Sequence, residues 1–432
     1  MYERKADLTA MQENGADESG AQNTGTLRIS VTSSVAYIPI EGATVTISYT
    51  GDPENPLTTL TTDSSGETEV VTLPTPPLSY SLDPESLQQP YSEYNILVTA
   101  EGYEPVYVTG SEMFANELSL QPIRMNPIEA EAGEDEKLVN IPVHTLFGNY
   151  PPKIPEEEIK PLAETGEIVL SRVVVPEYII VHDGVPSDSS APNYWVRYKD
   201  YIKNVASCEI YSTWPEAALY ANILVIMSFT LNRVYTEWYR NQGYNFTITS
   251  STAYDQKWIY GRNTFENIDY LVDSIFANFL SRPGVRQPIF TSYCDGQRVT
   301  CSGLSQWGSK YLGDQGYSAI EIIRYYYGND MYINTADVIS GVPSSWPGYA
   351  LTIGSSGEKV LQMQNQLNRI ARNYPAIPVI TADGIYGPAT ANAVRTFQGI
   401  FNLPQTGVVD YATWYEISEI YVGVSRIAEP GQ

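Results

Sequence analysis

The sequence predicts a multi-domain α+β protein with an N-terminal β-sandwich, a central α/β domain and a C-terminal three-helix bundle. Runs of alternating apolar and polar residues between 27 and 126, broken by Asp, Gly, Pro and Ser, indicate antiparallel strands. The run Ala217–Leu231 contains no charge, and a helix that is apolar all round belongs inside a sizeable domain. Amphipathic segments joined by Asp-Gly and Thr-Gly turns near the C-terminus indicate short packed helices.

Length and charge support separate parts. The chain has 432 residues, for which two to four domains are expected. Its net charge of −25 argues against nucleic acid as a partner. Residues 1–170 hold 28 Asp/Glu and 7 Lys/Arg, a net of −21, which leaves −4 for residues 171–432. One half is therefore strongly acidic and the other nearly neutral.

Composition shifts predict five segments: a disordered leader (1–26), the β-sandwich (27–126), a Pro/Glu-rich linker (127–172), the central domain (173–349) and the helical bundle (350–424). The leader is polar and acidic and has no basic-then-apolar run, so no secretory signal is expected. No segment is expected to span a membrane.

Two carboxylates precede the apolar run. Thr213-x-x-Glu216 with Pro215 predicts a capping box and a helix that begins near Trp214. Glu216 then has a structural role as a cap. Glu209 has no such role and is expected on the turn before the helix, where apolar neighbours would favour its protonated form.

Two stretches in the central segment resemble the SpoIID family of peptidoglycan lytic transglycosylases: Val205-Ala-Ser-Cys-Glu209 and Gly303-Leu-Ser-Gln306-Trp-Gly-Ser. The resemblance implies that Glu209 is the catalytic carboxylate. The chain departs from the family on the long helix, where Ile226–Ser228 replace basic residues, and before the second motif, where Thr300-Cys301 replaces His-Gly.

Uncharged polar and aromatic side chains near these motifs suit the hydroxyl and N-acetyl groups of a glycan. We expect substrate binding by Gln256, Tyr260, Ser305 and Gln306. The alternative is that these residues form the wall of the cleft and do not touch the substrate.

The N-terminal sandwich and the C-terminal helical segment each resemble a known module. Gly42-Ala43-x-Val45-x-Ile47 and Thr62-Asp63-x-x-Gly66 resemble the carboxypeptidase-regulatory or prealbumin-like sandwich, a structural module without chemistry. Near the C-terminus, Asp383-Gly384-Ile-Tyr386-Gly387-x-x-Thr390 and its shorter repeat Thr406-Gly407-x-Val409-Asp410-x-x-Thr413 resemble the peptidoglycan-binding domain 1 module.

This order of segments resembles the clostridial spore cortex-lytic enzymes of the SleC type. The resemblance implies a zymogen made in the mother cell and located in the cortex or coat region of the spore, with cortex peptidoglycan as substrate. It also implies activation by a subtilisin-like germination protease. We expect cleavage within 164–172, a region that includes Glu164, Glu167, Val169, Leu170 and Arg172. An N-acetylmuramoyl-L-alanine amidase and a non-catalytic cortex-binding spore protein remain the alternatives.

A lytic transglycosylase needs one carboxyl group and no cofactor, and no metal is implied. An amidase would require several zinc ligands, and the chain has only two histidines, His144 and His182. In the reducing compartment that the resemblance implies, we expect Cys294 and Cys301 to be free, partly buried thiols.

Overall fold

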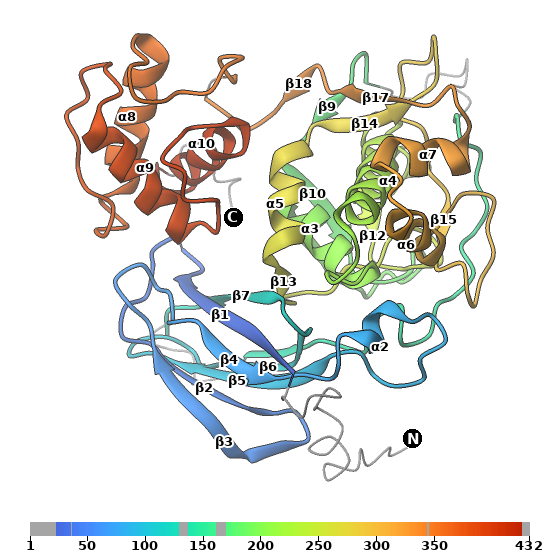
Figure 1. Ribbon diagram of the computed structural model, residues 1–432, viewed down its shortest axis with the longest axis horizontal. Helices are drawn as coiled ribbons and strands as arrows, with labels where there is room; N and C mark the ends of the chain where they lie inside the picture. The colour runs from blue at the N-terminus through green and yellow to red at the C-terminus, as the bar shows by residue number, and fades with distance from the viewer. Residues whose placement is uncertain (1–22, 36, 129–136, 161–169, 344, 426–432) are drawn as a thin grey trace.

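The computed structural model describes residues 23–35, 37–128, 137–160, 170–343 and 345–425. It is a mixed α+β structure in which sheets dominate the N-terminal part and helices the C-terminal part. Figure 1 shows the N-terminal sheets in blue below, the central domain above them on the right, and the C-terminal helices in red on the left.

The N-terminal β unit is made of two sheets around one core. Its elements are β1 (Thr24–Ser33), β2 (Thr44–Tyr49), β3 (Asp52–Thr61), β4 (Val71–Pro74), the short α2 (Ser79–Leu82), β5 (Ser92–Thr99), β6 (Val106–Met113), β7 (Leu118–Met125) and β8 (Lys137–Asn140). One sheet has the order β3-β2-β5-β6-β8, and the other contains β7-β1-β4. Every second residue of β1 is buried, among them Leu27, Ile29 and Val31, and these pack against Val45 and Ile96 of the facing sheet. Strand β1 begins at Thr24, so the predicted leader is too long at its end; residues 1–22 lie outside the described residues.

The central domain consists of short strands and helices packed around α4. Its elements are β9 (Val174–Val175), β10 (Tyr178–His182), β11 (Asn193–Arg197), α3 (Tyr198–Glu209), α4 (Glu216–Tyr235), η1 (Arg240–Gln242), β12 (Ile248–Thr249), β13 (Thr264–Phe265), α5 (Glu266–Ile275), β14 (Asn278–Ser281), β15 (Tyr293–Cys294), β16 (Leu304–Ser305), α6 (Gln306–Asp314), α7 (Ala319–Tyr327), β17 (Tyr332–Thr335) and β18 (Val338–Ile339). Helices α3, α5, α6 and α7 all contact α4. The apolar run is thus the core of this domain, as its composition predicts.

Helix α4 differs from its prediction at both ends. The capping box is not formed, because the Thr213 hydroxyl donates to Ser81 Oγ at 2.9 Å and Glu216 is exposed. The C-terminal end continues through Asn232 and Arg233 to Tyr235, because both polar side chains are buried with partners. At 20 residues, α4 is long and apolar enough to cross a membrane by length and hydropathy alone, but the 18-residue window that passes this test is 89% buried inside the protein.

The C-terminal helices are α8 (Glu358–Ile370), α9 (Pro388–Ile400) and α10 (Tyr411–Ser425). The two sequence repeats form the same hydrogen-bond network. Gln364 Oε1 accepts from the Gly384 N–H and Gln398 Oε1 from the Gly407 N–H, both at 2.8 Å. Each glutamine Nε2 donates to the Thr that opens the following helix, Thr390 or Thr413. The Asp-Gly and Thr-Gly turns are therefore fastened to the preceding helix, which fixes the spacing of the repeat.

The three parts pack directly on one another. Strand β13 of the central domain adds to the N-terminal sheet by pairing antiparallel with β7. At the same junction the Arg262 Nη2 is 2.8 Å from Glu112 Oε2, and both side chains are buried. On the other side, Lys199 of α3 forms ion pairs with Glu416 and Glu419 of α10, the latter at 2.9 Å.

The predicted linker (127–172) is only partly a connector. Residues 129–136 and 161–169 lie outside the described residues. Between them, β8 pairs in parallel with β6, and Tyr150 and Lys160 are buried against the central domain. The Pro/Glu composition indicated an exposed linker, but 137–160 has partners in the N-terminal sheet and in distant stretches of the chain.

Candidate functional site

Glu209 lies at the heart of the candidate site. The sequence predicted that Glu209 would lie on a turn, but it is the last residue of α3. Its side chain is fully buried. Its Oε1 accepts a hydrogen bond from the backbone N–H of Lys257 at 2.8 Å. Its Oε2 is buried without a hydrogen-bond partner among the described residues. One oxygen is thus held by the backbone, and the carboxyl group also interacts with the side chain of Tyr293.

Three side chains surround this carboxyl group. The Lys153 Nζ lies 4.0 Å from Glu209 Oε1 and 4.0 Å from the centre of the Tyr293 ring. Burial, and then the charge of Glu209, raises the pKa values of Tyr150 and Tyr293 well above their usual range. Burial lowers the pKa of Lys153, while the charges of Glu209 and Asp255 act in the opposite direction. The carboxyl group is therefore buried among two tyrosines and a lysine, and Lys153 lies close enough to interact with it electrostatically.

A buried ion pair fixes the segment that holds Glu209. Asp255 Oδ1 accepts from Arg233 Nε at 2.7 Å, and its Oδ2 accepts from the Tyr239 hydroxyl at 2.7 Å and from Thr249. Both carboxylate oxygens are bonded, so the lone pairs of Asp255 are committed to structure. The segment Tyr254–Trp258 is anchored here and presents the Lys257 N–H to Glu209.

Gln256 is buried, and both polar atoms of its amide have partners. Its Oε1 accepts from the Tyr201 and Thr230 hydroxyl groups at 3.1 and 2.8 Å, and its Nε2 donates to the Ile226 carbonyl at 3.1 Å. The residue connects α3 to α4. In this arrangement its amide is engaged inside the domain.

The other three predicted substrate residues lie in two places. Ser305 caps α6 by accepting from the Gly308 N–H at 2.9 Å, and Gln306 follows it as the first residue of that helix. Gln306 is fully buried, and neither atom of its amide has a partner among the described residues. Tyr260 is half-buried under Lys137 of β8, whose Nζ is 5.0 Å from the ring centre. Among the four predicted substrate residues, Gln306 is the one whose amide atoms have no hydrogen-bond partner within the described residues. It is the first residue of α6, which follows β16.

Strand β16 brings Ser305 and Gln306 close to Tyr293. It pairs in parallel with β15, so that Leu304 lies beside Tyr293 and Ser305 beside Cys294. The second sequence motif thus meets the neighbourhood of Glu209 through β15. Sequence reasoning missed Tyr293, Tyr150 and Lys153, and the signal that could have indicated the last two was Tyr150-Pro-Pro-Lys153, an aromatic and a cation held in extended backbone by prolines.

The expectation of free thiols at Cys294 and Cys301 is wrong. The two form a disulfide, with Cα atoms 6.0 Å apart. The intervening loop folds back because the Asp295 carboxylate accepts hydrogen bonds from three backbone N–H groups of the loop. Cys208, beside Glu209, is a buried free thiol. Among the described residues, no three His, Cys, Asp or Glu side chains cluster as metal ligands.

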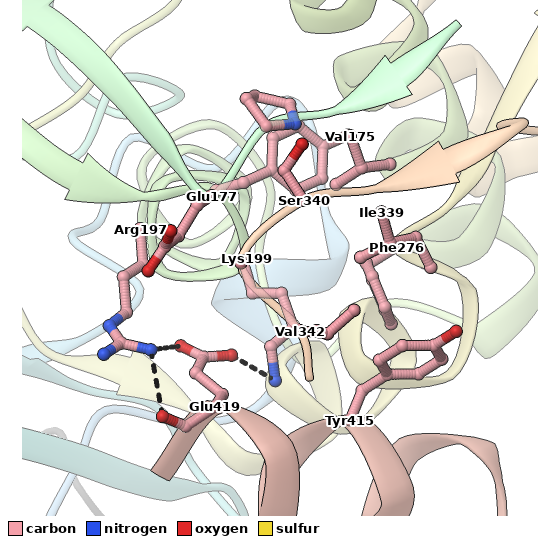
Figure 2. A pocket seen from close by; sticks show the side chains of 13 residues that line it. Val175, Glu177, Arg197, Lys199, Phe276, Ile339, Ser340, Val342, Tyr415 and Glu419 are labelled. Atoms are coloured by element: carbon pink, nitrogen blue, oxygen red, sulfur yellow. Dashed lines mark hydrogen bonds and ion pairs between the residues drawn. The ribbon is translucent and has the colours of Figure 1, made fainter. Parts of the chain in front are cut away.

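A hollow of about 410 Å³, open to solvent, lies away from Glu209, between the central domain and α10. Figure 2 shows Arg197, Lys199 and Glu419 reaching toward one another at its edge, with Tyr415 and Phe276 on the opposite side. Glu419 accepts from Arg197 at 3.0 Å as well as from Lys199. These charges are paired among themselves, so the hollow is part of the contact between the two domains.

Comparison with known proteins identifies one part of the chain. Residues 356–417 match the family described as "Putative peptidoglycan binding domain", a stretch that covers α8, α9 and the first half of α10. The match does not include the central domain, and no curated protein matches the chain. The chain thus contains a peptidoglycan-binding domain and is associated with peptidoglycan or the cell wall.

Solved structures add no information on function. The TIE protein of Bacillus anthracis is 14% identical over 25% of this chain and 17% of its own, with a TM-score of 0.17. The minor pilin GBS52 of Streptococcus agalactiae is 12% identical over 26% and 48%, also with 0.17. A 3-chlorocatechol 1,2-dioxygenase of Rhodococcus opacus is 10% identical over 26% and 63%, with 0.18. This chain spans less than two thirds of each.

Proposed function

We propose that the protein is a lytic transglycosylase that cleaves the glycan strands of spore cortex peptidoglycan. The observation that carries the proposal is Glu209, whose carboxyl group is buried with one oxygen held by the Lys257 N–H and the other without a hydrogen-bond partner in the part of the chain that the structure describes. The peptidoglycan-binding domain supplies the substrate class. The resemblance of the two central motifs to the SpoIID family supports the reaction type.

A single carboxyl group is sufficient for this reaction. Glu209 would donate its proton to the glycosidic oxygen that leaves C1 of N-acetylmuramic acid. The resulting carboxylate would then accept the proton of the 6-hydroxyl group of the same sugar, whose oxygen bonds to C1 and closes a 1,6-anhydro ring. Ring closure is intramolecular and needs no second carboxylate to activate water. Asp255 is the other carboxylate whose charge acts on Lys153, but its oxygens are bonded to Arg233, Tyr239 and Thr249. A mechanism with one carboxyl group is consistent with this structural role of Asp255.

The protein would be made as a zymogen and activated by a subtilisin-like germination protease. Of the predicted cleavage region, Glu164, Glu167 and Val169 lie outside the described residues. At its end, Arg172 is exposed, while the Leu170 N–H donates to the Tyr235 carbonyl at 3.1 Å. Cleavage there would separate the N-terminal β unit from the central domain at the start of β9.

Product analysis tests the proposal. Processed protein is incubated with decoated spores or isolated cortex rich in muramic-δ-lactam, and the released muropeptides are identified by mass spectrometry. A lytic transglycosylase releases fragments with 1,6-anhydro-muramic ends. Free stem peptides would instead show an amidase. Binding to cortex without released fragments would show a non-catalytic cortex-binding protein, a role that the matched domain could perform alone.

A further inference from the structure

A short extended segment of the chain closes over Glu209. Residues 150–160, here called the strap, follow β8 and end before the predicted cleavage region. Tyr150 is 3% exposed, and the Lys153 side chain is 9% exposed, whereas Ile154 is 44% exposed. The strap therefore has one face against the central domain and one toward solvent.

Each inward-facing charge of the strap has a partner. Lys153 donates to the Asp255 carbonyl at 2.6 Å. The Glu156 carboxylate receives two hydrogen bonds from Arg233, at 2.6 and 2.8 Å, and the Glu158 carboxylate two from Arg282, at 2.6 and 2.8 Å. Such bidentate pairs are strong and directional. Ion pairs of this kind are expected in a segment that packs on the domain and not in an exposed linker.

The backbone of the strap is fastened as well. The Ile154 N–H donates to the Ala253 carbonyl at 2.8 Å, and the Glu158 carbonyl accepts from the Phe290 N–H at 2.7 Å. Gln287 bonds both the N–H and the carbonyl of Lys160, at 3.2 and 3.1 Å. The strap thus follows one path across the domain from the carboxyl group of Glu209 to the end of the described segment.

This path conflicts with catalysis. To take a proton, a glycosidic oxygen must come within about 2.6–3.2 Å of a Glu209 oxygen. Glu209 is 0% exposed, Lys153 Nζ lies 4.0 Å from its Oε1, and Tyr150 is buried close enough for the charge of Glu209 to raise its pKa. No sugar ring can reach the carboxyl group while these two side chains are in place.

We infer that the strap is the inhibitory segment of the zymogen: it occupies the site that the glycan must enter, and the N-terminal β unit serves to hold it there. The inference rests on the proposed function for its biological meaning, but the closure of Glu209 is a property of the chain itself. The β unit docks on the central domain through Arg262, β13 and Ser81, whereas Lys153 of the strap lies 4.0 Å from the carboxyl group itself.

The full-length chain carries the test. In one variant Tyr150→Ala and Lys153→Ala remove the two side chains beside Glu209; in a second, residues 150–160 are replaced by Gly and Ser of equal length. Asp314→Asn, which breaks an exposed ion pair with Lys310 on α6, is the matched control. Circular dichroism checks that each variant is folded, and hydrogen exchange at the Ile154 N–H follows the strap in the wild-type chain and in the first variant.

Two readouts separate the inference from the proposed function. Modification of Glu209 by a water-soluble carbodiimide and glycine ethyl ester, measured by peptide mass spectrometry, reports access without requiring activity. We expect labelling to rise about tenfold or more in both strap variants and to stay at the wild-type level in the control. We also expect both uncleaved strap variants to lyse cortex, while uncleaved wild-type protein does not.

If Glu209 is labelled to the same extent in the folded strap variants and in the wild-type chain, the inference is wrong. If labelling rises but neither the variants nor the processed wild-type protein release muropeptides, the strap is confirmed as the cover of the site and the proposed function fails. If labelling rises and only the processed protein lyses cortex, the β unit is the inhibitor and the inference is wrong.

Discussion

Replacement of Glu112 by alanine tests how the N-terminal β unit is joined to the central domain. The Glu112 carboxylate is 2.8 Å from Arg262 Nη2, and neither side chain is more than 1% exposed. The backbone of Glu112 also bonds Asn263, which donates to its carbonyl at 2.8 Å. Alanine keeps the backbone contacts and leaves the buried Arg262 guanidinium without the Glu112 carboxyl group as its partner. Loss of one partner from a buried pair costs about 3–5 kcal/mol.

A second variant separates charge from hydrogen bonding. Glu112→Gln retains an acceptor for Arg262, so we expect a loss of only about 1–2 kcal/mol near pH 5. Burial raises the pKa of Glu112 to about 7, against the effect of Arg262. The folded state therefore binds the proton more tightly than the unfolded state. Its stabilising contribution is complete below pH 4.5 and is lost as the pH rises through 7, so wild type should lose stability relative to Glu112→Gln between pH 5 and pH 8.

Urea unfolding of the full-length chain, followed by tryptophan fluorescence, measures both effects. Asp314→Asn removes an exposed pair and should change the free energy of unfolding by less than about 1 kcal/mol. If Glu112→Ala unfolds at the wild-type urea concentration, the buried pair does not join the two parts. If the difference between wild type and Glu112→Gln is constant with pH, Glu112 does not titrate in this range.

Two further predictions concern the site and the C-terminal helices. Gln306→Ala should slow turnover on cortex more than it lowers the melting temperature, because its buried amide has no partner among the described residues; the reverse ranking would mark it as structural. Acid should loosen α10: burial tends to raise the pKa of Glu419, but Lys199 and Arg197 hold it at about 2, so its contribution is present above pH 4.5 and lost as the pH falls toward 2. Burial raises the pKa of Glu416, which acts in the opposite sense; we expect Glu419 to dominate because it pairs with both cations. A melting temperature that falls equally between pH 5 and 3 in wild type and Glu419→Gln would contradict this.

The sequence predicted the elements whose burial or turns follow from the order of residues within one segment. The uncharged run Ala217–Leu231 is the core of the central domain, and the alternation in β1 buries every second residue. The C-terminal repeats predicted turns between helices, although the role of Gln364 and Gln398 in fastening those turns was not visible. In each of these cases, residues close in sequence determine which side chains are buried and where a turn forms.

Features that depend on distant partners were not predictable. Helix α4 continues past Arg233 because Glu156 and Asp255 neutralise that residue, and neither is near it in sequence. The strap has the composition of an exposed linker, but side chains distant in sequence, among them Arg233, Arg282 and Gln287, hold it against the domain. Glu209 was predicted as a site residue from its motif, but its helical position and its closure by Tyr150 and Lys153 needed the tertiary structure.

The central claim is that Glu209 is the general acid and base of glycan cleavage. The direct test compares processed wild-type protein with processed Glu209→Gln on isolated cortex, with muropeptides identified by mass spectrometry. The amide oxygen of Gln can still accept from the Lys257 N–H, so folding and cortex binding should be unchanged. The variant cannot donate the proton, and release of 1,6-anhydro-muropeptides should fall by about 10²–10⁴-fold. Release by the variant near the wild-type rate would contradict the account.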